Sequence, residues 1–199
     1  MTTFADSRLI QRLSAPLRGV FSTADLQTAL AERHPAAFGR RVHALLKERV
    51  LQRFTRGFYV AEEFELPVLS QRIAPSSCIS FETVLARHLI VGPDPRRRIV
   101  ATKVGRTRRY AARGLEVEHL SISEHLAFGC KTVDGIRQAS AEKAVLDILY
   151  FHLRGRRCVF DIYSDLNLGK LDMERVRSYL RHYKNPKFVA FAERVLELR

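Results

Sequence analysis

The segment 141–153 carries apolar side chains almost all the way round a helix, and this places the strongest constraint on the fold. Ser140, immediately before it, is a favourable N-cap residue, so the helix is expected to begin at Ala141. The apolar positions are Ala144, Val145, Leu146, Ile148 and Leu149. A helix that is apolar on every side is stable in water only when other elements cover it. We therefore expect this helix at the centre of a domain.

Short predicted elements surround the central helix. Alternating and β-branched residues predict strands, and amphipathic spacing predicts further helices. The predicted strands are 99–104, 109–112, 115–122 and 132–139, and the predicted helices are 81–89 and two that begin at Asp172 and at Asn185. Strands in the middle of a region with helices toward its ends indicate an α+β domain.

A different pattern occupies the first sixty residues. Residues 4–14 have the spacing of a short amphipathic helix that ends before Pro16 and Gly19. A capping box at Ser22 and Asp25 then begins a second helix. Pro35 suits the first turn of a third helix, and the hairpin strands 50–55 and 58–60 follow it. Three helices followed by a small hairpin are the order of elements in a winged helix-turn-helix.

The composition changes at residues 62–65 and at Pro67, which predicts a domain boundary. We therefore predict a winged helix-turn-helix DNA-binding domain at 1–62 and a C-terminal α+β domain at 63–199. No internal repeat or low-complexity linker separates the two, so they are expected to pack closely.

The third predicted helix has one apolar face and one basic face. Its apolar face comprises Phe38, Val42, Leu45 and Leu46, and the opposite face comprises Arg40, His43 and Lys47, with Arg41 on the flank. Basic side chains of this kind contact phosphates and guanine edges in the major groove. An ordinary solvated helix has the same pattern, but the hairpin that follows favours DNA binding. Arg53 and Arg56 are expected on or beside the wing, within reach of phosphate.

The charge balance favours a polyanionic partner. The chain has 34 Lys and Arg residues against 21 Asp and Glu, a net charge of +13. One segment, 95–115, contains no acidic residue and eight basic ones: Arg96, Arg97, Arg98, Lys103, Arg106, Arg108, Arg109 and Arg113. It is interpreted as a second phosphate-contacting surface or as a docking face for an acidic partner, with a solvated basic loop as the alternative.

No catalytic or metal-binding motif stands out. The chain lacks a Gly-x-x-x-x-Gly-Lys-Ser/Thr loop, a Gly-x-Ser-x-Gly elbow and the Asp-x-Asp pair of nucleotidyltransferases. Its three cysteines are far apart and not at metal-ligand spacing, so we expect incidental thiols in a reducing compartment. We expect no catalytic residue, no metal and no cofactor.

The same reading predicts a cytoplasmic protein, associated with the nucleoid when it is bound to DNA. No apolar run approaches the ~20 residues that span a bilayer, so no membrane partner is expected. Met1 to Asp6 has no apolar region and does not resemble a secretory signal.

The chain resembles the AbiEi family of antitoxins over nearly its whole length. Three segments carry the resemblance. Residues 51–60, LQRFTRGFYV, are similar to the family's wing, which ends in Arg-Gly-aromatic-Tyr. Residues 79–88, ISFETVLARH, are similar to its Ile-Ser-x-x-Ser-Ala-Leu-x-x-His segment, and residues 141–150, AEKAVLDILY, to its Pro-Glu-Lys-Ala-Leu-Leu-Asp signature. The chain departs from these patterns at Thr83, Val84, Leu89 and Ala141.

The resemblance implies the antitoxin of a type IV toxin–antitoxin system. The winged helix would bind inverted repeats in its own promoter and repress the operon, and the C-terminal domain would oppose a nucleotidyltransferase toxin, with or without a stable contact. Family members are not enzymes and need no cofactor. The resemblance implies groove or phosphate contacts at Arg40, Arg41, His43 and Lys47, wing contacts at Arg53 and Arg56, and a longer footprint through Arg106, Arg108 and Arg109. No motif identifies a toxin-binding residue.

Two alternatives remain open at this point. One is a stand-alone winged-helix regulator whose C-terminal domain senses a ligand or dimerises. The other is a nucleic-acid-processing enzyme that uses Glu142 or Asp161, although Glu142 is explained by the helix dipole and Lys143 with Asp147 by an i, i+4 pair.

Overall fold

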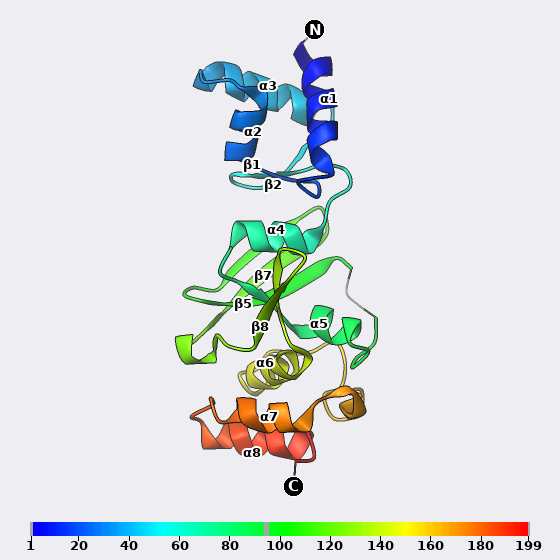
Figure 1. Cartoon of the computed structure of the whole chain (residues 1–199), viewed down its shortest axis with the longest axis vertical. Helices are drawn as coiled ribbons and strands as arrows, with labels where there is room; N and C mark the ends of the chain where they lie inside the picture. The colour runs from blue at the N-terminus through cyan, green and yellow to red at the C-terminus, as the bar shows by residue number, and fades with distance from the viewer. Residues whose placement is uncertain (1, 94–95, 199) are drawn as a thin grey trace.

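The computed structural model describes residues 2–93 and 96–198 and has a mixed α+β fold. Met1, Asp94, Pro95 and Arg199 lie outside the described residues. The basic segment 95–115 is therefore described from Arg96 onward. The elements are stacked along the long axis of the molecule (Figure 1). Three N-terminal helices stand above a small sheet, α4 separates that sheet from a larger one, and the remaining helices lie below.

The first sixty residues form the predicted three helices and hairpin, with one additional strand. The elements are α1 (Thr2–Ser14), β1 (Val20–Ser22), α2 (Thr23–Leu30), α3 (Pro35–Lys47), β2 (Gln52–Thr55) and β3 (Phe58–Val60). The capping box is confirmed, because Ser22 Oγ accepts the Asp25 N–H at 3.1 Å and Asp25 Oδ2 accepts the Ser22 N–H at 2.6 Å. Pro35 occupies the first turn of α3 as predicted.

The small sheet has a hydrophobic cluster on each face. Its order is β1-β3-β2 and both pairings are antiparallel. Because successive strand residues point to opposite faces, Val20 joins the core of the larger sheet while Phe21 packs with Leu26 and Leu45 among the N-terminal helices. The described parts on either side of residue 62 therefore pack closely, and the proposed domain boundary stays a prediction.

Helix α4 (Leu66–Ile73) was not expected from the sequence and lies between the two sheets (Figure 1). Pro67 stands in its first turn, which is compatible with a helix start. Its Arg72 hydrogen-bonds the Val20 carbonyl and pairs with the Asp25 carboxylate. The helix thus connects the N-terminal elements to the larger sheet.

The larger sheet has the strand order β6-β7-β5-β4-β9-β8. Its strands are β4 (Cys78–Ile79), β5 (Arg98–Val104), β6 (Arg108–Ala112), β7 (Leu115–Ile122), β8 (Cys130–Val133) and β9 (Ile136–Ala139). β5 and β7 are parallel, as are β4 and β9, whereas the other neighbours are antiparallel. The predicted strand 132–139 is divided by a turn at Asp134 and Gly135, where φ is +50° and +75°, into two paired strands.

Helices cover the remaining face of the larger sheet. They are α5 (Phe81–Arg87), α6 (Ala141–Leu153), α7 (Met173–Leu180) and α8 (Pro186–Val195), with short 3₁₀ turns at Glu124–Leu126 and Leu168–Lys170. The central helix is confirmed, since every residue from 141 to 149 is buried. Its N-cap is confirmed too, because Ser140 Oγ accepts the Lys143 N–H at 3.3 Å. Asp172 and Asn185 cap the last two helices as expected.

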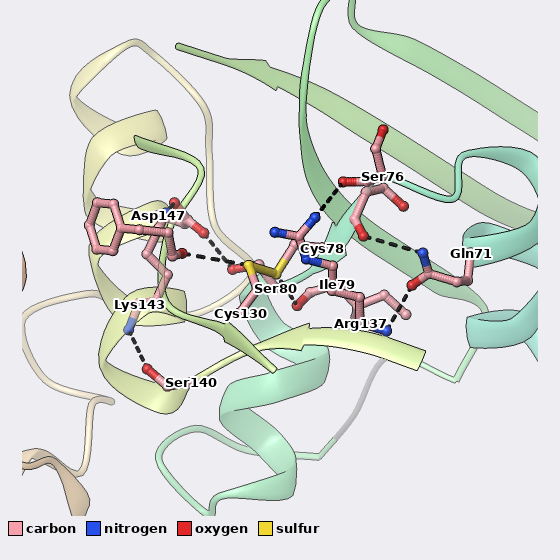
Figure 2. Close-up of a disulfide and its surroundings, with 12 residues drawn as sticks. Gln71, Ser76, Cys78, Ile79, Ser80, Cys130, Arg137, Ser140, Lys143 and Asp147 are labelled. Atoms are coloured by element: carbon pink, nitrogen blue, oxygen red, sulfur yellow. Dashed lines mark hydrogen bonds and ion pairs between the residues drawn. A yellow bond between two sulfur atoms is a disulfide. The ribbon is translucent and has the colours of Figure 1, made fainter. Parts of the chain in front are cut away.

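A disulfide joins Cys78 to Cys130, with 6.3 Å between their Cα atoms (Figure 2). The expectation of incidental thiols is wrong for this pair, because β4 and β8 flank β9 and bring together residues 52 positions apart. Cys158 is free and half-buried. The cysteine argument for a reducing compartment therefore no longer holds. None of the described helices is both long enough and apolar enough to cross a membrane.

Reduction of this disulfide should destabilise the protein, because the cross-link lowers the conformational entropy of the unfolded chain. We expect dithiothreitol to lower the free energy of unfolding by about 2–4 kcal/mol, measured by guanidinium denaturation. Cys130→Ser should lose the same amount and no longer respond to the reductant, whereas Cys158→Ser should respond like the wild type. A wild-type midpoint that is unchanged by reduction would contradict the prediction.

His119 of β7 should make the fold sensitive to acid. Its side chain is fully buried, with Nε2 3.0 Å from Ser70 Oγ on α4. Burial, with a smaller contribution from the nearby Lys103, lowers the pKa of His119 to about 4. Unfolding therefore takes up a proton at this residue below pH ~6.5.

The free energy of unfolding should fall by roughly 3 kcal/mol from this residue alone as the pH drops from about 6.5 to about 4. Denaturation at a series of pH values measures it. His119→Gln should remove this part of the pH dependence, and His125→Gln, at an exposed position, should retain it. Identical pH profiles for wild type and His119→Gln would rule the explanation out.

Candidate nucleic-acid interface

Helix α3 presents an exposed basic face. Arg40, His43 and Lys47 are exposed, while Val42 and Leu45 on the opposite side are buried, as the spacing predicted. No ion pair among the described residues includes any of the three basic side chains. A Cβ added at Gly39 would meet no atom within 4 Å, so the surface beside Arg40 is open. This face can approach a polyanion without breaking an internal contact.

Arg41 departs from the prediction, because its guanidinium is used inside the protein. Its Nε and Nη2 donate to the two carboxylate oxygens of Asp6 at 2.9 and 2.5 Å, and Nη1 donates to the Leu30 carbonyl at 2.8 Å. Asp6 is only 4% exposed. The hydrogen bond with Asp6 raises the pKa of Arg41 above its ordinary value. Arg41 therefore ties α3 to α1 and α2, and we remove it from the candidate interface.

The hairpin between β2 and β3 carries two further exposed arginines. Arg53 lies on β2, and Arg56 lies in the turn. Gly57 in that turn has φ of +83°, a conformation that favours glycine. Its carbonyl accepts the Thr23 N–H at 2.9 Å, which anchors the hairpin to the start of α2. The position of Arg56 relative to the helices is thereby restricted.

The basic segment that ends at Leu115 is partly neutralised by the neighbouring strand. Arg109 Nε on β6 lies 2.8 Å from Glu116 Oε1 on β7. Glu118 of β7 accepts hydrogen bonds from Arg98 and Arg156. Burial alone would raise the pKa of Glu118, but these hydrogen bonds and charges outweigh it and hold that pKa below its ordinary value.

Arg106 and Arg108 are the candidate contacts in this segment that lie outside every described ion pair. Both are exposed, and no ion pair among residues 2–93 and 96–198 includes either. Arg109 remains 66% exposed despite its pairing with Glu116, so its outer surface is still available. The sequence did not reveal this neutralisation, because Glu116 and Glu118 come after the basic segment in the chain. They lie beside it only because β7 pairs with β6.

The candidate residues form two surfaces. The first is the basic face of α3. The second lies along the edge strands β2 and β6 of the two sheets, which are in contact. Arg53 of β2 is therefore beside the strand that carries Arg108 and Arg109. The small sheet lies between α3 and α4, so the first surface is at the N-terminal end of the molecule (Figure 1). No group of three or more described His, Cys, Asp or Glu residues is placed to hold a metal ion.

Comparison with solved structures finds proteins of similar fold. No family model matches the chain, and no curated protein matches it. The crystal structure of the RV2827C protein from Mycobacterium tuberculosis matches with a TM-score of 0.63 and 15% sequence identity, over 96% of this chain and 75% of that chain. At this identity the likeness establishes a shared fold alone.

Neighbouring arginines on α3 should have separable roles. Arg41→Ala would leave the buried Asp6 carboxylate without its partner, so it should lower the free energy of unfolding by roughly 2 kcal/mol. Arg40→Ala changes an exposed side chain, and its effect should stay within ~0.5 kcal/mol. Urea denaturation of both variants measures the difference. Equal stability of the two variants would show that the Asp6 contact is dispensable.

Proposed function

We propose that this protein is a DNA-binding repressor whose N-terminal residues 1–62 are a winged helix-turn-helix. The single observation that carries the proposal is the exposed face of α3, with Arg40, His43 and Lys47 outside every described ion pair. The element order α1, β1, α2, α3, β2, β3, with β2 and β3 as a hairpin beside the helices, supports it. The net charge of +13 is consistent with a polyanionic partner.

In the proposed complex α3 enters the major groove. Arg40 and Lys47 would contact guanine edges or phosphates, and Arg53 and Arg56 would contact the adjacent backbone. Arg106 and Arg108 would extend the phosphate contacts along the duplex, with Arg109 in a lesser role because Glu116 holds it. Inverted repeats in the protein's own promoter are the proposed target, which places the protein in the cytoplasm and on the nucleoid.

We also propose that the C-terminal part is the antitoxin domain of the AbiEi type. Its support is the resemblance at residues 79–88 and 141–150, two segments that meet in the fold. Ser80 Oγ donates to Asp147 Oδ2 at 2.7 Å, and Lys143 pairs with Asp147 (Figure 2). Lys143 and Asp147 are each 1% exposed, so these motif residues hold the domain together and the toxin-opposing surface lies elsewhere.

DNA binding should depend on α3 and on the sheet edges in different ways. Arg40→Ala should weaken binding to the promoter by ~1–3 kcal/mol and reduce discrimination against scrambled DNA. Arg108→Ala should weaken binding to both DNAs alike and reduce the salt slope by ~1, since it removes one phosphate contact. Mobility shifts over a salt series, with promoter and scrambled duplexes, measure both effects.

The matched control is Arg157→Ala, an exposed arginine in the C-terminal part. It should leave binding, selectivity and salt slope unchanged. Promoter binding no tighter than binding to scrambled DNA would overturn the repressor proposal. Equal loss of selectivity in the Arg40 and Arg108 variants would overturn the division between base and phosphate contacts.

The antitoxin proposal has its own test. Co-expression with a nucleotidyltransferase encoded beside this gene should restore growth of cells that the nucleotidyltransferase alone arrests. The Arg40→Ala variant, expressed from an unrelated promoter, should still restore growth if antitoxicity resides in the C-terminal part. Continued arrest beside a folded, DNA-binding protein would instead favour a stand-alone regulator.

A further inference from the structure

Backbone pairing attaches the β8–β9 hairpin only weakly to the rest of the larger sheet. β9 pairs with β4 at one residue pair, Ile79 with Gln138, whereas β5 and β7 pair along seven. β8 is the edge strand, with β9 as its one neighbour among the described strands. The disulfide from Cys130 of β8 to Cys78 of β4 spans β9 (Figure 2). The place of the hairpin in the sheet therefore depends strongly on this covalent bond.

The hairpin also contacts elements that lead to the N-terminal helices. In its turn, the Asp134 carbonyl accepts a hydrogen bond from Arg18 Nη1 at 2.8 Å, and Arg18 lies between α1 and β1. On β9, the Arg137 N–H donates to Gln71 Oε1 of α4 at 2.8 Å. Release of the hairpin would therefore loosen its contacts with α4 and with the segment that joins α1 to β1.

A cavity of about 120 Å³ opens beside the disulfide, and both cysteines line it. Cys130 is half-buried, whereas Cys78 is 4% exposed, so an attacking group reaches the Cys130 side of the bond more easily. The cavity has room for the thiol end of a small molecule, while the rest of that molecule stays outside. The disulfide is therefore accessible to a small thiol in the folded protein.

Two cations outside the described ion pairs line the same cavity. They are Lys103 of β5 and Arg137 of β9, and the described lining residues include no acid. The Arg137 guanidinium donates to the Ser76 carbonyl at 3.3 Å, which holds it beside the disulfide (Figure 2). Positive charges attract an anionic thiol and stabilise thiolates, the reacting form in disulfide exchange.

We propose that the Cys78–Cys130 disulfide is a reducible latch on the β8–β9 hairpin, opened by a small thiol that carries carboxylates. The thiolate of this molecule attacks the Cys130 sulfur, the bond to Cys78 breaks, and Cys78 leaves as a thiolate that takes up a proton. A second small thiol attacks the mixed disulfide at the small-molecule sulfur and releases Cys130. The two small thiols become one disulfide, and the two electrons and two protons that they lose reach the two protein cysteines.

Reduction of the folded full chain by glutathione, an anionic thiol, and by uncharged 2-mercaptoethanol tests the chemistry. Alkylation at timed intervals, followed by mass spectrometry, counts the free cysteines. The ratio of the glutathione rate to the 2-mercaptoethanol rate should fall about fivefold in Lys103→Gln and in Arg137→Gln, because each loses one cation that attracts glutathione. The matched control is Lys184→Gln, at an exposed lysine outside the cavity, which should keep the wild-type ratio.

Acid quenching during the reaction should trap glutathione on Cys130. Thermal melting of each variant shows whether it is folded, and either cation variant provides the test if the other is not. A mixed disulfide on Cys78, or a rate ratio that is unchanged in the folded cation variants, would overturn the proposed exchange. Reduction that occurs only when denaturant unfolds the chain would overturn it as well.

Hydrogen exchange tests the release of the hairpin. Reduction should accelerate exchange of the amides at 130–139 by about tenfold more than exchange of those at 108–122, because β6 and β7 lie at the other edge of the sheet. The second segment is thus an internal control for a general loss of stability. Equal acceleration in the two segments, or no acceleration in the hairpin, would overturn the latch.

Discussion

The burial of α6 is the constraint on which the C-terminal part of the structure depends. Nine consecutive residues of this helix are buried, and three of them, Glu142, Lys143 and Asp147, are charged. Ions in such a position are stable only when they are paired and their remaining hydrogen-bonding capacity is used. Asp147 meets this condition by pairing with Lys143 and accepting from Ser80. The contact fixes α6 against the segment that begins α5, so the larger sheet and its helices have one arrangement.

The small sheet packs against both the larger sheet's core and the N-terminal helices. Val20 on one face belongs to the larger core and Phe21 on the other belongs to the N-terminal core, so three short strands connect two hydrophobic clusters. Arg72 of α4 reinforces the connection through its contacts with Val20 and Asp25. The orientation of α3 relative to β6 is therefore set by packing, and the two basic surfaces are presented by one body.

Local signals predicted much of this fold. Helices with caps at Ser22, Ser140, Asp172 and Asn185 begin where the sequence placed them, because a cap and its first turn are neighbours in the chain. The short strands β1 and β4 were missed, since three or two residues carry no periodicity and form only against distant partners. Helix α4 was missed because Pro67 and the acidic residues before it were interpreted as a boundary.

The candidate site was predictable where a side chain's exposure follows from its own element. Arg40, His43 and Lys47 lie where the spacing of α3 put them. Arg41 could not be assigned, because its partner Asp6 is 35 positions away and belongs to another helix. The same non-local cause hid the Cys78–Cys130 pairing and the neutralisation of Arg109 by Glu116. A sequence pattern predicts the helix or strand in which a residue lies. The ion-pair or disulfide partner of that residue depends on how the elements are arranged in the fold.

In the proposed complex, the exposed face of α3 contacts base edges of DNA. Photo-crosslinking from position 43, with the protein bound to its promoter duplex, tests this most directly. We expect crosslinks to bases within each half of an inverted repeat, and far fewer from a probe at position 157. Crosslinks that come only from a probe on β6, with none from position 43, would contradict it.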